Sequence, residues 1–366
     1  MKRVIGFVAI FLLVIIGYYV QPILFPRSSV NIPVQPTESS VSHQPLKHTV
    51  VESDGFANYI GGSLESFEAV YGLPNSVENS GFFFEIRTYS VESGILEVNI
   101  EENKITAIKV LGNQIDSGDF SFGKTIRKLA SQYNLSADFS LDFDEEPVML
   151  ELSEDDMRHR PLIAFNNDSF AMVFFNGTSE KLIGTVYMDK ETLLRFMPYK
   201  INSGNPLSSR MQESNLDWSM INQQRQQRTI QSVNAYRLLI DQPVYTNGNN
   251  EDSQRMIVAF LNQPQNYLST ARQEAWDIEQ SAYIGNLHFE LTEKELKELA
   301  EDQKTDFERA LYYSPEIDPT FTLLYWLSQT HLTHLFDQAD PGKLNIAFSQ
   351  ESVLILIQQP STEDSQ

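Results

Sequence analysis

An internal repeat in the N-terminal half of the chain restricts the fold more than any other feature. The segments "IGGSLESFEAVYGLP" (60–74) and "FGKTIRKLASQYNLS" (122–136) align at an offset of 62 residues. In each, a glycine and then Ser or Thr precede apolar residues spaced i, i+3 and i+7, the pattern of a capped amphipathic helix. We therefore expect two copies of one unit, each opening with a helix. The matching pairs are Gly61/Gly123, Ser63/Thr125, Leu64/Ile126, Phe67/Leu129, Tyr71/Tyr133 and Leu73/Leu135.

Strand-like runs follow each predicted helix. They are "GFFFEIRTYS", "GILEVNIEE" and "KITAIKVLG" in the first unit, and "PVMLELS", "PLIAFNN", "SFAMVFFNG" and "LIGTVYMD" in the second. Alternating polarity with β-branched and aromatic residues is typical of antiparallel strands that bury one face. The sequence predicts a domain over 57–200, made of units at 57–117 and 118–200, in which each helix packs on its own small sheet.

The N-terminus predicts a membrane anchor. Lys2 and Arg3 precede an uncharged apolar run over residues 4–20 that extends with "QPILF" to Phe25. This is about the 20 residues that span a hydrocarbon core, and the basic end should stay in the cytoplasm. A cleaved signal peptide is the alternative, but the run ends in bulky residues rather than the small ones that signal peptidase needs. We expect residues 1–25 to form an uncleaved transmembrane helix with the remainder extracytoplasmic.

Composition and charge limit the kinds of partner and chemistry that the chain can have. Residues 26–56 are rich in Pro, Ser, Gln and Thr, which predicts a flexible stalk. The formal charge of -22 repels phosphates, so nucleic acid is excluded as a partner. The chain has no cysteine, which removes disulfides, thiol nucleophiles and thiolate metal sites. A cysteine-free extracytoplasmic chain suits a Gram-positive bacterium.

The C-terminal part predicts mixed helix and strand after a polar bridge at 201–228. A helix is indicated by "QSVNAYRLLIDQPVY", another by the Thr292/Glu295 capping box, and a third by Asp318–Pro319 at the start of "DPTFTLLYWLSQTHLTHLF", which we interpret as one helix to Phe336. The segment "KLNIAFSQESVLILIQ" predicts two closing strands, before a polar tail at 359–366.

The repeat resembles the CAP-associated N-terminal domain, a bacterial module. The first copy carries its "IG-x-S" opening and "YG-x-P" turn, with "YGLPNS" and "ITAIKVLG" as the strongest matches over about 59–196. The second copy departs from it, with "YNLSAD" in place of "YGLPNS" and the insert "DFDEEPVML". The resemblance implies a structural or binding unit and assigns no catalytic residue.

Residues 229–358 resemble a CAP domain, named for cysteine-rich secretory proteins, antigen 5 and pathogenesis-related 1. The matches are "VNAYRLLIDQPVY", "WLSQTHLTHLF" and "LNIAFSQESVLILI", in the family's order. The resemblance implies an α+β chain with a degenerate CAP-like α-β-α sandwich at its C-terminal end.

The family cavity of two histidines and two acids, which can hold a divalent ion such as zinc, is incomplete here. By resemblance, His331 takes one histidine position and Glu279 in "DIEQSAYIG" one acid position. Thr270 in "NYLST" stands where the other histidine is expected, and no glutamate precedes Trp326. The nearest upstream acid is Asp318, which we expect to cap its helix.

His334 is a candidate replacement ligand, because residues three apart lie on one helical face. The alternative is that both histidines sit at a polar helix end, where the dipole favours cations. Ser328 near His331 could suggest a nucleophile, but no orienting acid is identifiable, so we interpret it as structural. The acidic segments "DFDEE" (142–146) and "SEDD" (153–156) lack the spacing of a calcium loop, which favours solvated loops.

Two functions remain open from the sequence. The first is a membrane-anchored binding or scaffold protein that recognises a cell-envelope or extracellular ligand without catalysis. The second is a metal-dependent envelope hydrolase that uses Glu279 and His331, with zinc as the candidate metal. The loss of half the cavity set favours the first.

Overall fold

The computed structural model describes residues 48–143, 146–204, 216–281, 288–339 and 342–359, which all belong to one compact unit. The predicted transmembrane helix, most of the stalk and the end of the polar tail lie outside these residues. Among the helices in the described ranges, none combines the length and the apolarity needed to span a membrane.

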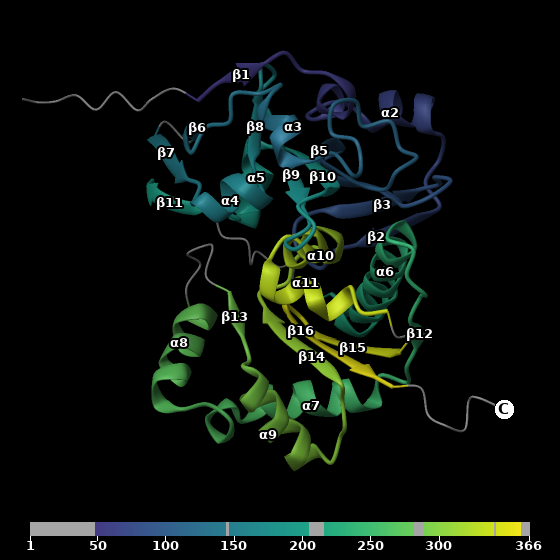
Figure 1. Cartoon of the computed structure of the whole chain (residues 1–366), viewed down its shortest axis with the longest axis vertical. Helices are drawn as coiled ribbons and strands as arrows, with labels where there is room; N and C mark the ends of the chain where they lie inside the picture. Colours follow the sequence, from purple (N-terminus) through teal and green to yellow (C-terminus); the bar gives the residue numbers. More distant parts are fainter. Residues whose placement is uncertain (1–47, 144–145, 205–215, 282–287, 340–341, 360–366) are drawn as a thin grey trace, which may run out of the picture. The chain divides into compact units, whose positions relative to one another are not determined.

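Within the described ranges, the repeat and β1 from the end of the predicted stalk build a single eight-stranded sheet (Figure 1), so residues 50–51 form a strand rather than a flexible spacer. Neighbouring strands are antiparallel except for β1 with β8. The prediction of a separate sheet for each unit is therefore wrong. In spatial order the strands are β1 (Val50–Val51), β8 (Leu162–Phe165), β9 (Ser169–Phe175), β10 (Leu182–Asp189), β5 (Lys104–Leu111), β4 (Ile95–Glu101), β3 (Glu85–Tyr89) and β2 (Ser76–Asn79).

The two units join through equivalent strands. Gly61 N–H donates to the Ile105 carbonyl and Gly123 N–H to the Leu182 carbonyl, each at 2.8 Å, which makes Ile105 and Leu182 repeat partners 77 residues apart (182 − 105). The register pairs Lys109 with Val186, which have the same separation (186 − 109). β5 and β10 thus pair about a local two-fold axis. A lone unit would leave one of these strands as an open edge, which pairing removes.

The repeat helices α2 (Leu64–Tyr71) and α3 (Ile126–Ala130) cover the same face of this sheet, as the sequence pairs predict. Phe67 and Leu129 are fully buried there, and Leu64 is nearly so. Ile126 is only partly buried, because α3 is a short helix of five residues.

We expect Leu64→Ala to lower the free energy of unfolding by about 2–3 kcal/mol, the low end for a buried leucine. Ile126→Ala should cost less, because its side chain is half-buried. Urea unfolding of the chain measures both. Val70→Ala, on the exposed side of α2, is the control, and a loss at Val70 equal to that at Leu64 would show that the apolar face is misassigned.

A second small sheet lies next to the first, in the order β11-β7-β6. It contains the predicted strand "PVMLELS", and β11 lies in part of the predicted polar bridge. The segment "SEDD", expected as a solvated loop, instead opens α4 (Glu154–His159), where Ser153 and Asp156 form a capping box. The bounds are β11 (Lys200–Ser203), β7 (Glu146–Glu151) and β6 (Asp138–Phe143), with α5 (Lys190–Phe196) between β10 and β11.

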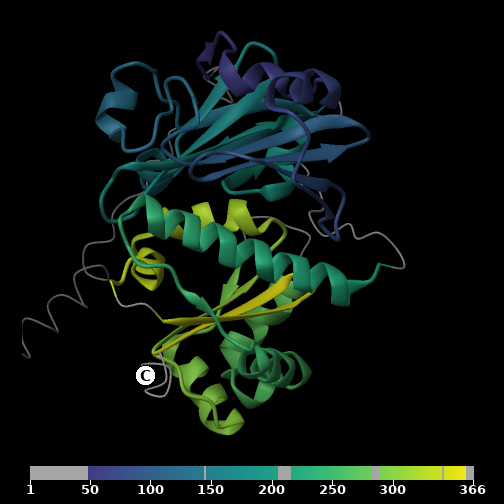
Figure 2. The same ribbon diagram turned by 90° about the vertical axis from the view of Figure 1, so that its right-hand side faces the viewer.

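The C-terminal part is an α-β-α sandwich (Figure 2). Successive residues of β14 point to opposite faces of the sheet. Tyr312 therefore packs with one helical layer, and Leu311 and Tyr313 pack with the other. The predicted sandwich and the two closing strands are confirmed. The sheet order is β12 (Thr246–Asn247), β15 (Lys343–Ser349), β16 (Ser352–Gln358), β14 (Arg309–Ser314) and β13 (Phe289–Glu290).

In the described part of the chain, three α-helices cover each face of this sheet. The first of them, α6, begins inside the predicted bridge, so the expected boundary at residue 229 is too late. α6 (Trp218–Leu239), α10 (Pro319–Leu327) and α11 (Thr330–Phe336) lie on one face, and α7 (Glu251–Asn262), α8 (Thr270–Ser281) and α9 (Glu293–Gln303) on the other.

The segment expected as one helix from Asp318 to Phe336 is two, which corrects that prediction. α10 ends at Leu327 because the Leu327 carbonyl accepts from Gly177 N–H and from the Thr333 hydroxyl, each at 2.9 Å. The Ser328 hydroxyl donates to the Tyr325 carbonyl at 2.7 Å, which satisfies another helix-end carbonyl.

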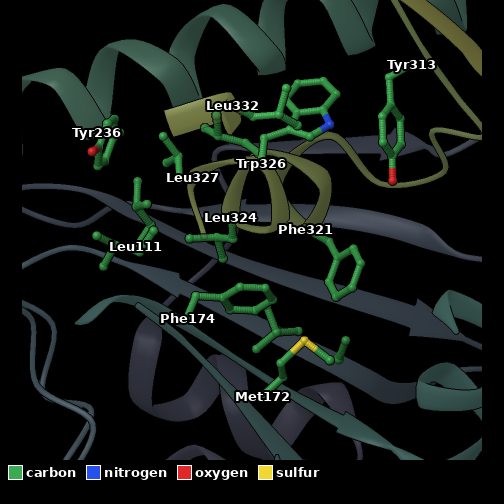
Figure 3. Close-up of a cluster of buried hydrophobic side chains, with 14 of the residues drawn as sticks. Leu111, Met172, Phe174, Tyr236, Tyr313, Phe321, Leu324, Trp326, Leu327 and Leu332 are labelled. Carbon is green, nitrogen blue, oxygen red and sulfur yellow. The ribbon is translucent and has the colours of Figure 1, made fainter. Parts of the chain in front are cut away.

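The repeat sheet and the sandwich share one apolar core around α10. Figure 3 shows Phe321 and Leu324 directed toward Phe174 on β9, while Trp326 lies on the other side of α10. Gly184 permits this approach, because a Cβ there would lie 2.7 Å from Leu324 Cδ2 and from the Val110 carbonyl oxygen. The segments 57–200 and 229–358 are thus packed together rather than separated by a linker.

Candidate functional site

His331 lies near the start of α11 with 62% of its side chain exposed. Its Nε2 is 3.4 Å from Glu290 Oε2. His288 Nε2 is 3.3 Å from the other oxygen of the same carboxylate, and the His288 ring stacks on Tyr313 at 5.3 Å. We call His288, Glu290 and His331 the histidine–glutamate cluster.

Glu290 is the central group of this cluster. Burial would raise the pKa of Glu290, but hydrogen bonds and charge interactions with His288 and His331 outweigh burial and hold that pKa below its usual range. The carboxylate therefore stays ionised at neutral pH. Sequence reasoning missed His288 and Glu290, although H-x-E on a strand places both side chains on one face.

Glu279 does not join this cluster. It is 2% exposed, and its Oε1 accepts from the Ser314 hydroxyl at 3.5 Å. On β14 the side chain of Ser314 shares a face with Tyr312, whereas Glu290 pairs with Tyr313, which points the opposite way. The structure therefore places Glu279 and His331 against opposite faces of the β13–β14 pair.

The other candidate positions are also dispersed. Thr270 is exposed at the first position of α8, and His334 is exposed one turn after His331 on α11. The charge of His334 acts on Asp337, whose pKa is nevertheless raised, chiefly by burial. Within the described ranges, no group of three or more His, Cys, Asp or Glu side chains is placed to hold a metal ion. The zinc ligand set suggested by resemblance stays a hypothesis.

Ser328 has a structural environment. It is fully buried at the α10–α11 break, where its hydroxyl accepts from Arg160 Nη1 at 3.1 Å while donating to the Tyr325 carbonyl. Arg160 is held in turn by Asp155 and Asp156 at 2.8 and 2.7 Å. An oxygen fixed by a guanidinium, with no histidine bonded to it among the described residues, lacks the activating base of a nucleophile.

Trp326 lies in the core. It is 1% exposed, meets Tyr313 edge to face at 5.4 Å and stacks on Phe336 at 6.1 Å. Its indole packs α10 against the sheet of the sandwich, through Tyr313 on β14.

Asp318 caps α10 as expected, accepting from Phe321 N–H at 3.0 Å, but it also has partners that the sequence did not suggest. Its Oδ2 accepts from Lys109 Nζ at 2.5 Å and from Asn99 Nδ2 at 2.9 Å. Burial would raise the pKa of Asp318, but the charge and hydrogen bond of Lys109, with the Phe321 and Asn99 bonds, lower it.

This ion pair belongs to a larger buried group of charges between the repeat sheet and the sandwich. Lys109 Nζ lies 2.9 Å from Glu97 Oε2, and Arg228 of α6 bonds both Glu97 at 3.2 Å and Glu78 at 2.5 Å. Glu97, Asn99 and Lys109 share one face of the β4–β5 pair, and charged side chains in a strand normally face water. That face is instead covered by α6 and α10.

Comparison with known proteins agrees with this architecture. The family model described as CAP-associated N-terminal matches residues 60–199. An extracellular protein containing an SCP domain from Bacillus anthracis has a similar structure, with a TM-score of 0.63 at 20% identity, covering 86% of this chain and 99% of that one. A cysteine-rich secretory protein from Staphylococcus aureus has a TM-score of 0.64 at 12% identity, covering 86% and 98%. No curated protein matches the chain by sequence.

The family match covers the repeat domain, and the two solved structures share the fold of most of the chain. Identities this low establish the shared fold and not a shared activity. Residues 60–199 match the CAP-associated N-terminal family model, and the chain shares the fold of the extracellular SCP-domain protein and of the cysteine-rich secretory protein.

Proposed function

We propose that the chain is a membrane-anchored, extracytoplasmic binding or scaffold protein of the cell envelope, in a Gram-positive bacterium, whose CAP-like domain does not catalyse a reaction. The observation that carries the proposal is the dispersal of the candidate cavity residues. Glu279 is buried on one face of the β13–β14 pair and His331 is exposed on the other, and by resemblance Thr270 stands where a histidine is expected.

Binding to envelope material is the direct test. Full-length protein in detergent should co-sediment with membrane-free cell-wall material and release no soluble fragments from it, whereas the predicted anchor alone would carry the chain into any fraction that contains membrane. His331→Ala and Glu279→Gln should sediment as the wild type does, because neither residue is needed for binding under this proposal. Release of soluble fragments that stops in His331→Ala would replace the proposal with catalysis.

The orientation is a separate prediction from Lys2, Arg3 and the apolar run up to Phe25. Protease added to intact cells should degrade the chain beyond the stalk, because the acidic domains lie outside. A control protein of the cytoplasm should survive the same treatment. Protection of the domains until lysis would reverse the orientation.

The alternative is a metal-dependent hydrolase, and the histidine–glutamate cluster is the observation in its favour. We expect excess zinc to raise the melting temperature of the protein little, because catalytic zinc sites use three convergent protein ligands and no three such side chains of the described residues, the cluster included, are placed to hold a metal ion. Scanning calorimetry with and without zinc measures this, and Glu290→Gln should not change the response.

His331→Ala is the second variant for the zinc experiment. A large stabilisation by zinc that this variant abolishes would favour the hydrolase. His334→Ala distinguishes the two exposed histidines, since only replacement of the histidine that binds zinc would abolish the stabilisation.

A further inference from the structure

A pocket of about 410 Å³ opens beside the histidine–glutamate cluster, between the repeat domain and α10. Glu151 of β7, Asp156 and Arg160 of α4, and Lys200 of β11 line it from the repeat domain, and Tyr325 of α10 lines it from the sandwich. The edge of the Tyr325 ring meets the His288 ring at 6.2 Å, so the pocket and the cluster are neighbours. Its volume falls within the range of small-molecule sites.

The charges in this pocket are already paired. Lys200 Nζ lies 2.8 Å from Glu151 Oε2, and Arg160 Nη2 lies 2.7 Å from Asp156 Oδ1. The four lining charges sum to zero. A charged ligand would have to break one of these pairs, and an apolar ligand would have to desolvate all four groups.

Tyr325 supplies the free hydrogen-bonding group. Within the described part of the chain its hydroxyl has no hydrogen-bond partner, while the Arg160 guanidinium lies 4.9 Å from the centre of its ring. Burial raises the pKa of Tyr325, so the hydroxyl stays protonated and can both donate and accept. Carboxylate acceptors and an ammonium donor lie around the same space.

We propose that this pocket binds an uncharged saccharide unit of the cell envelope. A sugar has many hydroxyls, each able to donate and accept, and no net charge, which matches a neutral lining that alternates donors and acceptors around an aromatic side chain. The proposal rests on the binding function above and gives that function a ligand class and a site that the CAP domain alone does not contain.

The experiment titrates full-length protein with glucose, N-acetylglucosamine and the N-acetylglucosamine dimer, using ligand-observed NMR and calorimetry. The wild type should bind at least one of them saturably. Tyr325→Phe should weaken that binding by about 3- to 10-fold, as expected for one lost hydrogen bond. Lys200→Met should weaken it as well, since the ammonium lies at the pocket.

Matched controls separate the pocket from general effects. Tyr267→Phe removes a hydroxyl that bonds Asp302 at the surface of the sandwich, and Lys297→Met removes an ammonium paired with Glu293 on α9. Both should bind as the wild type does. Unchanged melting temperatures confirm that each variant is folded.

Saturable binding that weakens in Tyr325→Phe and Lys200→Met but in neither control supports the proposal. It is overturned if the wild type binds none of the three sugars, or if the pocket variants bind as well as the controls. If either of these results is obtained while the wild type still co-sediments with cell-wall material, the saccharide site is rejected and the proposed binding function is not contradicted. Loss of co-sedimentation in the wild type contradicts that function itself.

Discussion

Replacing Trp326 with alanine is expected to lower the free energy of unfolding by about 3–5 kcal/mol. The indole is 1% exposed and contacts Tyr313 of the central sheet and Phe336 of α11. Alanine would leave a cavity at the point where α10, α11 and the sheet meet. Because α10 also packs on β9 and β10, the loss should destabilise the repeat domain and the sandwich together. Urea unfolding followed by circular dichroism measures the change.

Trp218→Ala is the matched control. Trp218 is only partly buried at the first position of α6, where its ring meets Phe82 edge to face at 5.8 Å. The same deletion should therefore cost less there than at Trp326. Equal losses at the two positions, or a loss at Trp326 below about 1 kcal/mol, would contradict the central packing role of Trp326.

Individual strands of the repeat domain could be predicted from the sequence, although both of their faces are buried. The alternation in "KITAIKVLG" and "LIGTVYMD" predicted β5 and β10. The pairing of β5 with β10 could not be predicted, because the sequence pattern of a strand is the same whether the strand lies at the edge of a sheet or pairs with its repeat partner. The break after Leu327 was missed for a related reason, since the Gly177 N–H that ends α10 comes from a distant segment.

The candidate site was only partly predictable. The helix-start pattern correctly located Asp318 at an N-cap. The contact of His331 with Glu290 was missed, because Glu290 lies on strand β13 and His331 on helix α11, and no local spacing in the sequence links the two. Lys109 was missed because a lysine in an alternating strand normally faces water, and here α10 covers that face.

Replacing Lys109 with methionine is expected to cost about 3–5 kcal/mol, the range for removing one partner of a buried ion pair. Methionine has a similar length, so the cavity term is small. The cost arises because the Glu97 and Asp318 carboxylates, both nearly or fully buried, lose the ammonium at 2.9 and 2.5 Å. Lys104→Met, at the exposed first position of the same strand, should change stability little.

A second substitution and a pH series test the electrostatic origin of this loss. Adding Asp318→Asn should recover part of it, because the amide removes one unpaired charge and still caps α10. In the wild type the folded pKa of Asp318 is lowered, so its stabilisation is full above the unfolded pKa near 3.8 and is lost as pH falls through the lower folded value. In Lys109→Met burial acts without the ammonium and raises that pKa, so acidification should relieve the destabilisation. The stability difference between wild type and Lys109→Met should therefore narrow as pH falls toward 4, and a difference independent of pH would assign the loss to packing.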